Sequence, residues 1–97
     1  MTAYTFDVRK LIEICRKNDV EMISVFGSTA RGESNEQSDI DLLVKFAEKK
    51  SLLGLVRLER ELSEALGRKV DLLTEGAISP YLREQILREL QVIYESR

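Results

Sequence analysis

Two aspartates stand at alternate positions of an otherwise apolar segment, and this segment constrains the fold more than any other part of the chain. It reads Ser38-Asp39-Ile40-Asp41-Leu42-Leu43-Val44. In a β-strand, residues i and i+2 point to the same face, about 6.6 Å apart along the backbone. Ile40, Leu42 and Val44 would then face a core while Asp39 and Asp41 project together from the opposite face. Aspartate is depleted in strands, so this pair is unusual.

A neighbouring pair of carboxylates favours a bound cation. Left alone, the two charges repel each other and resist ionisation, whereas a divalent cation stabilises both charged forms. The alternative without a ligand is that Asp39 caps the strand and Asp41 is solvated.

A third carboxylate repeats the pattern in Lys69-Val70-Asp71-Leu72-Leu73. Val70 and Leu72 would face the core, and Asp71 the other side. A carboxylate between valine and leucine is unfavourable unless something compensates it. If this strand lies beside the first, three carboxylates meet at one place. A strand-edge Asp71 in water is the alternative.

Gly27-Ser28 follows a predicted buried strand. A glycine there lets the backbone approach a ligand closely, and Ser28 offers a hydroxyl beside free backbone N–H groups. Together these groups can hold a triphosphate, and Arg31 could add a cation to the same phosphates. The dipeptide alone is more typical of a simple turn with a helix cap.

The periodicities predict helices interleaved with strands. Three helices are predicted: residues 6–17, capped by Thr5; residues 52–66, capped by Ser51 and ended by Gly67; and a last helix from Pro80, with an apolar stripe of Leu82, Ile86, Leu90 and Ile93. Three strands are predicted over residues 20–26, 39–46 and 69–74. Residues 29–32 are predicted to form a helical turn, and residues 33–38 a loop. We therefore expect an α/β (α+β) fold, with a small mixed β-sheet of about three or more strands backed by helices.

Composition narrows the chemistry. The 97 residues contain no histidine, which excludes histidine bases, histidine metal ligands and Ser-His triads. The remaining oxygen ligands suit Mg²⁺ or Mn²⁺. A net charge of −2 argues against broad nucleic-acid binding. The single cysteine, Cys15, and the absence of a long apolar run or leader predict a cytoplasmic protein without membrane association.

These elements in register resemble a known family. Gly27-Ser28, ten further residues and then Asp39-x-Asp41 are similar to the signature of the DNA polymerase β-like nucleotidyltransferase superfamily, and Asp71 matches its third acidic residue. The stretch from Gly27 to Gly32 and the Asp39 strand look especially like the minimal nucleotidyltransferases of prokaryotes. The resemblance covers residues 20–74 closely, with no departure at a signature position, and implies one nucleotidyltransferase domain over residues 1–97.

The resemblance implies a role for each residue. Asp39 and Asp41 would hold the metal that escorts the triphosphate, and Asp71 would share the second metal and help to activate the attacking hydroxyl. Gly27 and Ser28 would cradle the β- and γ-phosphates, with Arg31 as a further phosphate contact. Two cations, Mg²⁺ or Mn²⁺, about 3.5–4 Å apart can stabilise both oxygens of an in-line displacement, with ATP as donor.

The resemblance also implies a partner. Many minimal members are antitoxins that attach AMP from ATP to a tyrosine of a HEPN-domain ribonuclease toxin. Because larger members carry an additional domain for the acceptor, we expect this chain to act on a partner protein in a hetero-oligomer. Two alternatives stay open: a catalytically silent antitoxin that masks its partner sterically, and a nucleotidyltransferase acting on a small molecule such as an aminoglycoside. The base preference, the number of nucleotides added and the activity of the chain alone do not follow from the sequence.

Overall fold

The computed structural model describes residues 4–33 and 38–96, in which helices alternate with strands. The predicted loop over residues 33–38 falls mostly on residues 34–37, outside the described residues. The elements are, in order, α1 (Val8–Lys17), β1 (Val20–Val25), α2 (Gly27–Ala30), β2 (Ile40–Phe46), α3 (Leu52–Leu66), β3 (Val70–Thr74), the short 3-10 helix η1 (Glu75–Ala77), α4 (Pro80–Glu89) and β4 (Gln91–Glu95).

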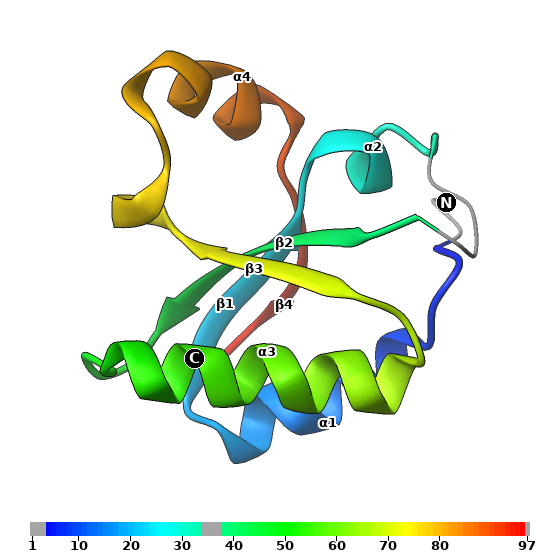
Figure 1. Cartoon of the computed structure of the whole chain (residues 1–97), viewed down its shortest axis with the longest axis vertical. Coiled ribbons are helices and arrows are strands. Elements are labelled where there is room, and N and C mark those ends of the chain that lie inside the picture. The colour runs from blue at the N-terminus through cyan, green and yellow to red at the C-terminus, as the bar shows by residue number, and fades with distance from the viewer. Residues whose placement is uncertain (1–3, 34–37, 97) are drawn as a thin grey trace.

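The strands form one mixed sheet in the order β3-β2-β1-β4 (Figure 1). β1 pairs antiparallel with both β2 and β4, whereas β2 and β3 run parallel. The helix α3 makes the crossover between the two parallel strands, as such a connection requires. The predicted mixed sheet backed by helices is therefore confirmed.

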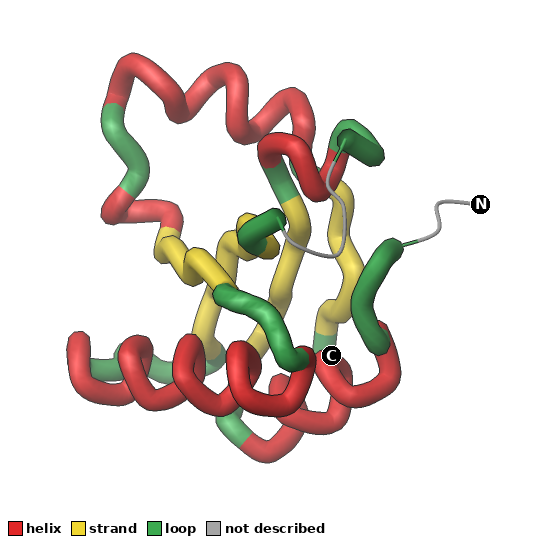
Figure 2. Tube along the Cα trace, turned by 45° about the vertical axis from the view of Figure 1, so that its right-hand side comes forward, coloured by secondary structure: helices red, strands yellow, loops and turns green. Residues whose placement is uncertain are grey.

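The two faces of the sheet have different coverings. α1 and α3 lie side by side across one face, as two views of the backbone agree (Figures 1 and 2). They bury the main core, to which β2 contributes Ile40, Leu42 and Val44. A smaller cluster on the α4 side consists of Phe26, Leu43, Ile78 and Ile86. Alternate residues of β2 thus serve opposite faces, as the sequence pattern predicted.

The helix ends follow local chemistry. Ser51 caps α3 by accepting a hydrogen bond from the N–H of Gly54, and Gly67 ends that helix at a φ of 67°. α4 begins at Pro80 after Ser79, as predicted. The predicted cap of the first helix was wrong: the side chain of Asp7, and not Thr5, accepts hydrogen bonds from Arg9 and Lys10, so the helix begins at Val8.

The predicted last helix was too long. α4 ends at Glu89, and residues 91–95 form the edge strand β4, so Leu90 and Ile93 do not extend a helical stripe. β1 would otherwise present an unpaired edge, which β4 covers with backbone hydrogen bonds. The predicted turn at residues 29–32 also begins earlier, at Gly27. No helix in the described part of the chain combines the length and the apolar character that crossing a membrane requires.

Candidate active site

Asp41 and Asp71 stand opposite each other on adjacent parallel strands. The register of β2 against β3 pairs Ile40 with Val70, Asp41 with Asp71 and Leu42 with Leu72. Because neighbouring residues in register share a face, both carboxylates project from the side of the sheet that carries α4. Their strand neighbours are almost fully buried against α1 and α3 on the other side. The sheet therefore fixes the separation of the two carboxylates.

Asp39 lies immediately before β2 and is more exposed. Its side chain is 46% exposed, and its Oδ2 is 3.8 Å from the Nζ of Lys69. The approach to Asp39 is braced by Arg68, whose Nη2 donates to the carbonyl of Ser38 at 2.6 Å. The N–H of Ile40 then donates to the carbonyl of Lys69, which begins the parallel pairing. Asp39 thus lies two residues before Asp41 in the chain and is open to solvent.

The electrostatics of this face centre on Asp41. Partial burial raises the pKa of Asp41, and the charges of Asp71 and Asp39 raise this pKa further, while Arg31 acts in the opposite direction. The charged form of Asp41 is therefore unfavourable without a counter-ion. A divalent cation would reverse this preference.

Gly27 fits closely against the same carboxylate. Its φ is +61°, and a Cβ at this position would stand 2.8 Å from the Oδ2 of Asp41. At this distance the carboxylate of Asp41 or the turn would have to shift, and the positive φ also favours glycine. The backbone on either side is tied to β2: the N–H of Phe26 donates to the carbonyl of Asp41, and the N–H of Asp41 donates to the Oγ1 of Thr29. The turn and the strand that carries Asp41 are thus joined by two hydrogen bonds.

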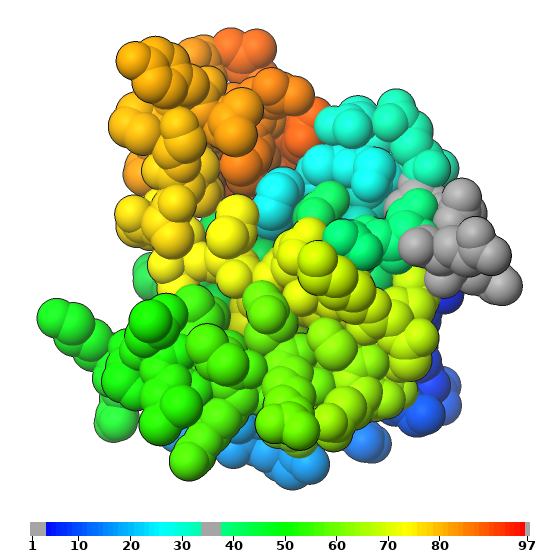
Figure 3. Space-filling model, viewed as in Figure 1, coloured from blue at the N-terminus to red at the C-terminus, as the bar shows by residue number. Residues whose placement is uncertain are grey.

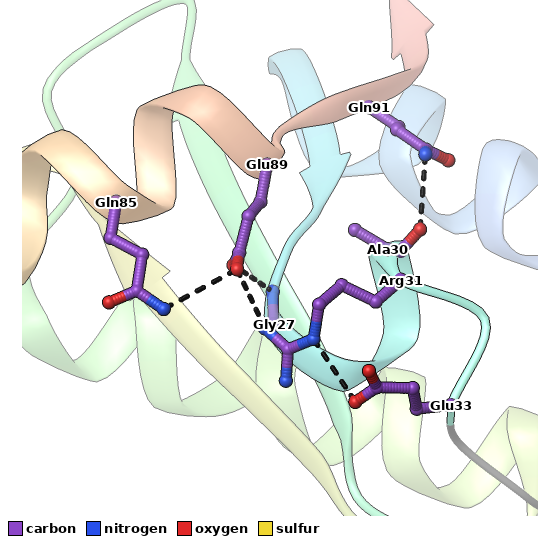
Figure 4. A network of polar contacts seen from close by, with 7 residues as sticks. All are labelled: Gly27, Ala30, Arg31, Glu33, Gln85, Glu89 and Gln91. Carbon is purple, nitrogen blue, oxygen red and sulfur yellow. Dashed lines mark hydrogen bonds and ion pairs between the residues drawn. The ribbon is translucent and has the colours of Figure 1, made fainter.

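Ser28 and Arg31 complete the predicted set. Ser28 is half-buried on α2, one residue after the glycine that touches Asp41. Arg31 follows α2 and is paired: its Nη1 is 2.7 Å from the Oε1 of Glu89, and its Nε is 3.1 Å from the Oε2 of Glu33 (Figure 4). All six residues singled out from the sequence therefore lie on β2, β3 and α2 or directly beside them.

Three further residues position the site, and the sequence analysis did not identify them. Thr29 is a buried hydroxyl that joins α2 to β2, Arg68 braces the residue before Asp39, and Glu89 links α4 to α2. Only Thr29 had a recognisable sequence feature, since it stands inside the Gly27-Ser28 turn. The other two act across the fold, on partners 30 and 62 residues away in the chain.

The donor set fits divalent cations that prefer oxygen. Among residues 4–33 and 38–96, no three acidic, histidine or cysteine side chains already stand together closely enough to hold a metal ion. Mg²⁺ typically binds through one or two carboxylates together with waters and substrate phosphates, and not in an all-protein cage. The register pair Asp41 and Asp71, with Asp39 beside it, fits that mode. In space-filling view, α2 (cyan) and α4 (orange) rise above β3 (yellow) on this side of the molecule (Figure 3).

An open recess elsewhere has no connection to this chemistry. It is lined by residues such as Phe46, Lys49 and Thr74 at the far ends of β2 and β3. Asp41 and Asp71 lie at the beginnings of these strands. We therefore place the candidate active site at the carboxylates and not at this recess.

Comparisons with known proteins show the family to which this chain is similar. The family described as "Polymerase beta, Nucleotidyltransferase" matches residues 9–97. A relative from Methanocaldococcus jannaschii, named "Putative protein adenylyltransferase MJ0435", is 56% identical over 81 residues, which are 84% of this chain and 87% of the relative.

Solved structures share the fold. A crystal structure of a toxin–antitoxin with AMP-PNP aligns with a TM-score of 0.79 and 27% identity, covering 94% of this chain and 75% of the other. A structure of the tri-AMPylated Shewanella oneidensis HEPN toxin in complex with its MNT antitoxin contains a chain that aligns with a TM-score of 0.70 and 25% identity, covering 92% of this chain and 70% of the other.

Proposed function

The chain belongs to the polymerase β family of nucleotidyltransferases, and from this premise we propose that it transfers AMP from ATP to a hydroxyl group of a partner protein. The proposed acceptor is a tyrosine of a HEPN-domain toxin, which this modification would silence, so that the chain acts as an antitoxin. The relative named as a protein adenylyltransferase and the AMPylated toxin complex support this proposal. The observation that carries it is the register pairing of Asp41 with Asp71, directly beside Gly27.

The proposed reaction is an in-line displacement at the α-phosphorus. The acceptor oxygen forms a bond to this phosphorus while the bond to the β-phosphate oxygen breaks, so pyrophosphate leaves. Two divalent cations, when bound, stabilise the attacking and leaving oxygens. Asp39 and Asp41 are the proposed ligands on the donor side, and Asp71 is the proposed group that shares a cation and assists removal of the hydroxyl proton.

We propose that α2 binds the phosphate tail of the triphosphate. Gly27 permits close approach of the backbone, and Ser28 adds its hydroxyl for the β- and γ-phosphates. Arg31 is the proposed charged contact, and a guanidinium suits phosphate oxygens geometrically. The buried hydroxyl of Thr29 accepts a hydrogen bond from the N–H of Asp41 and so joins α2 to the strand of this carboxylate. Pre-organisation of this kind is a large part of what catalysis of phosphoryl chemistry needs.

The direct test is transfer of label from ATP to protein. The purified chain, ATP labelled at the α-phosphate and Mg²⁺ are incubated with a lysate of the source cells, and labelled products are separated by size. We expect one labelled protein, and mass spectrometry should locate AMP on a tyrosine of a HEPN domain. Label on a small molecule would instead favour a small-molecule acceptor. Neutralisation of a toxin without label from any of the four triphosphates would favour steric masking.

Metal binding can be tested without any acceptor. Because the charges of Asp71 and Asp39 oppose ionisation of Asp41, we expect Mg²⁺ or Mn²⁺ to raise the melting temperature of the wild-type chain, and EDTA to reverse the rise. The Asp71→Asn variant should lose most of this rise. An equal rise in both proteins would contradict the proposed ligand set, and the exposed-site variant Glu64→Gln serves as the control for general charge effects.

A further inference from the structure

The side chain of Glu89 lies between two groups that the proposed function assigns to the triphosphate. Its Oε2 accepts a hydrogen bond from the N–H of Gly27 at 3.2 Å, and its Oε1 accepts one from the Nη1 of Arg31 at 2.7 Å. Gln85, one turn earlier on α4, donates to the same Oε1 at 3.4 Å. Figure 4 shows the carboxylate of Glu89 at the centre of this network.

The carboxylate of Glu89 accepts hydrogen bonds from the kinds of donor that hold a bound phosphate. An anionic oxygen that accepts from a backbone N–H and from a guanidinium is the arrangement in which proteins hold phosphate oxygens. Water competes little for these hydrogen bonds, since only 18% of the Glu89 side chain is exposed. The pair with Arg31 keeps Glu89 ionised by lowering its pKa, and Glu89 in turn raises the pKa of Arg31.

The position of Glu89 on its own helix is unfavourable for a negative charge. Glu89 is the last residue of α4, where the helix dipole places partial negative charge. Arg31 and the Gly27 N–H therefore provide the compensation that α4 itself does not. If a triphosphate took over these two groups, the carboxylate would lose its partners and face a second anion at close range.

We propose that Glu89 is a built-in competitor of the triphosphate: it holds Gly27 and Arg31 in the nucleotide-free protein and is displaced when the nucleotide binds. This inference rests on the proposed function. Glu89 is accordingly a positioning residue that keeps Arg31 oriented before the nucleotide arrives. Displacement would also release the end of α4 from α2, while the contact from the Gln91 Nε2 to the Ala30 carbonyl, at 3.0 Å, keeps the following strand attached.

The proposal makes an unusual prediction for Glu89→Gln. The amide keeps the shape of the side chain and can still accept from Gly27, but it carries no charge to hold Arg31. Because the competitor is weakened, the variant should bind a magnesium complex of a non-hydrolysable ATP analogue at least about threefold more tightly than the wild type. Isothermal titration calorimetry measures both dissociation constants, and thermal unfolding confirms that each protein is folded.

Two comparisons make the measurement specific. Glu84→Gln removes the same charge from the same helix, where the carboxylate pairs with Arg88 and is largely exposed, and it should leave the affinity within about twofold. In an Arg31→Ala background, Glu89→Gln should tighten binding less than it does in the wild type, because one of the two groups that the carboxylate holds is gone.

The outcomes separate this inference from the function on which it rests. If the wild type binds the analogue and Glu89→Gln does not lower the dissociation constant by at least about threefold, Glu89 is not a competitor. Equal tightening by Glu84→Gln would also overturn the proposal, because the tighter binding would then come from the change in net charge and not from the position of Glu89. A wild-type chain that binds no nucleoside triphosphate in the presence of Mg²⁺ would overturn the proposed function itself, and this inference with it.

Discussion

Replacing Asp41 with asparagine is expected to abolish nucleotidyl transfer and, in the same protein, to raise its thermal stability. Asparagine occupies the same space beside Gly27 but cannot offer a charged ligand to a cation. Loss of metal assistance is worth several kcal/mol, so transfer should fall roughly a thousandfold or more. Stability should rise because Asp41 is partly buried and lies beside Asp71 and Asp39, which makes its charge unfavourable in metal-free protein.

The dependence on pH identifies the cause of this stabilisation. The pKa of Asp41 is raised in the folded chain, so the charged form destabilises the fold above that pKa and has no effect where both folded and unfolded chains are protonated. In EDTA, the difference in melting temperature between Asp41→Asn and wild type should be largest near neutral pH. It should shrink as the pH falls through the raised pKa of Asp41.

A matched control is available at Asp19. This aspartate is exposed, pairs with Lys50 far from the site and has a φ of 58°, which asparagine also tolerates. Asp19→Asn should retain wild-type transfer and should not gain stability. An Asp41→Asn protein that is folded and still transfers AMP at a rate within tenfold of wild type would remove Asp41 from the proposed mechanism.

Replacing Gly27 with alanine should have the second largest effect, because it combines backbone strain with a collision. A non-glycine residue at φ +61° costs about 1–2 kcal/mol on its own. The added methyl group would also stand 2.8 Å from the Oδ2 of Asp41, so this carboxylate or the turn must shift. A displacement of this kind at reacting groups can reduce catalysis about a hundredfold. Labelled transfer and chemical denaturation measure the two effects separately.

Gly67 separates the strain from the collision. Its φ is +67°, but no atom lies within 4 Å of a Cβ built there. Gly67→Ala should therefore lose stability from strain alone and keep most of the transfer activity. Gly27→Ala should lose more stability and more transfer activity than Gly67→Ala. In an Asp41→Ala background, which removes the obstructing carboxylate, the two alanine substitutions should cost the same stability. Equal costs in the wild-type background would show that the contact with Asp41 does not matter.

The strands that carry the carboxylates were predictable because their pattern is local. Alternation of Ile40, Asp41 and Leu42, and of Val70, Asp71 and Leu72, assigns each residue to a face once a strand is assumed. Burial of both apolar sets on one side puts Asp41 and Asp71 on the same face, because a slip of one residue would expose the apolar residues. The direct pairing of Asp41 with Asp71 comes from the structure, because a slip of two residues would keep the same faces. The helix over residues 52–66 was equally local, with a serine cap and a glycine stop.

The features that escaped prediction depend on distant partners. Leu90 and Ile93 continue the helical spacing of Leu82 and Ile86, yet residues 91–95 form a strand because the edge of β1 is available to pair with them. Glu89 is an ordinary surface residue by sequence, and its role appears only when α4 lies beside α2. Leu52 shows the same limit: its helical spacing with Leu55 and Leu58 predicts a place on the buried face of the helix, yet Leu52 is 75% exposed.

The order of the strands gives the two halves of the candidate site different resistance to local unfolding. β2 is hydrogen-bonded on both edges, to β1 and β3, and its inward side chains are buried. Its amides can exchange with solvent only when the sheet itself opens, whereas the four-residue α2 and the largely exposed α4 can open alone. Asp41 thus stands on a central strand of the fold, whereas the groups assigned to the phosphates stand on a part that can rearrange around its ligand while Asp41 stays in place.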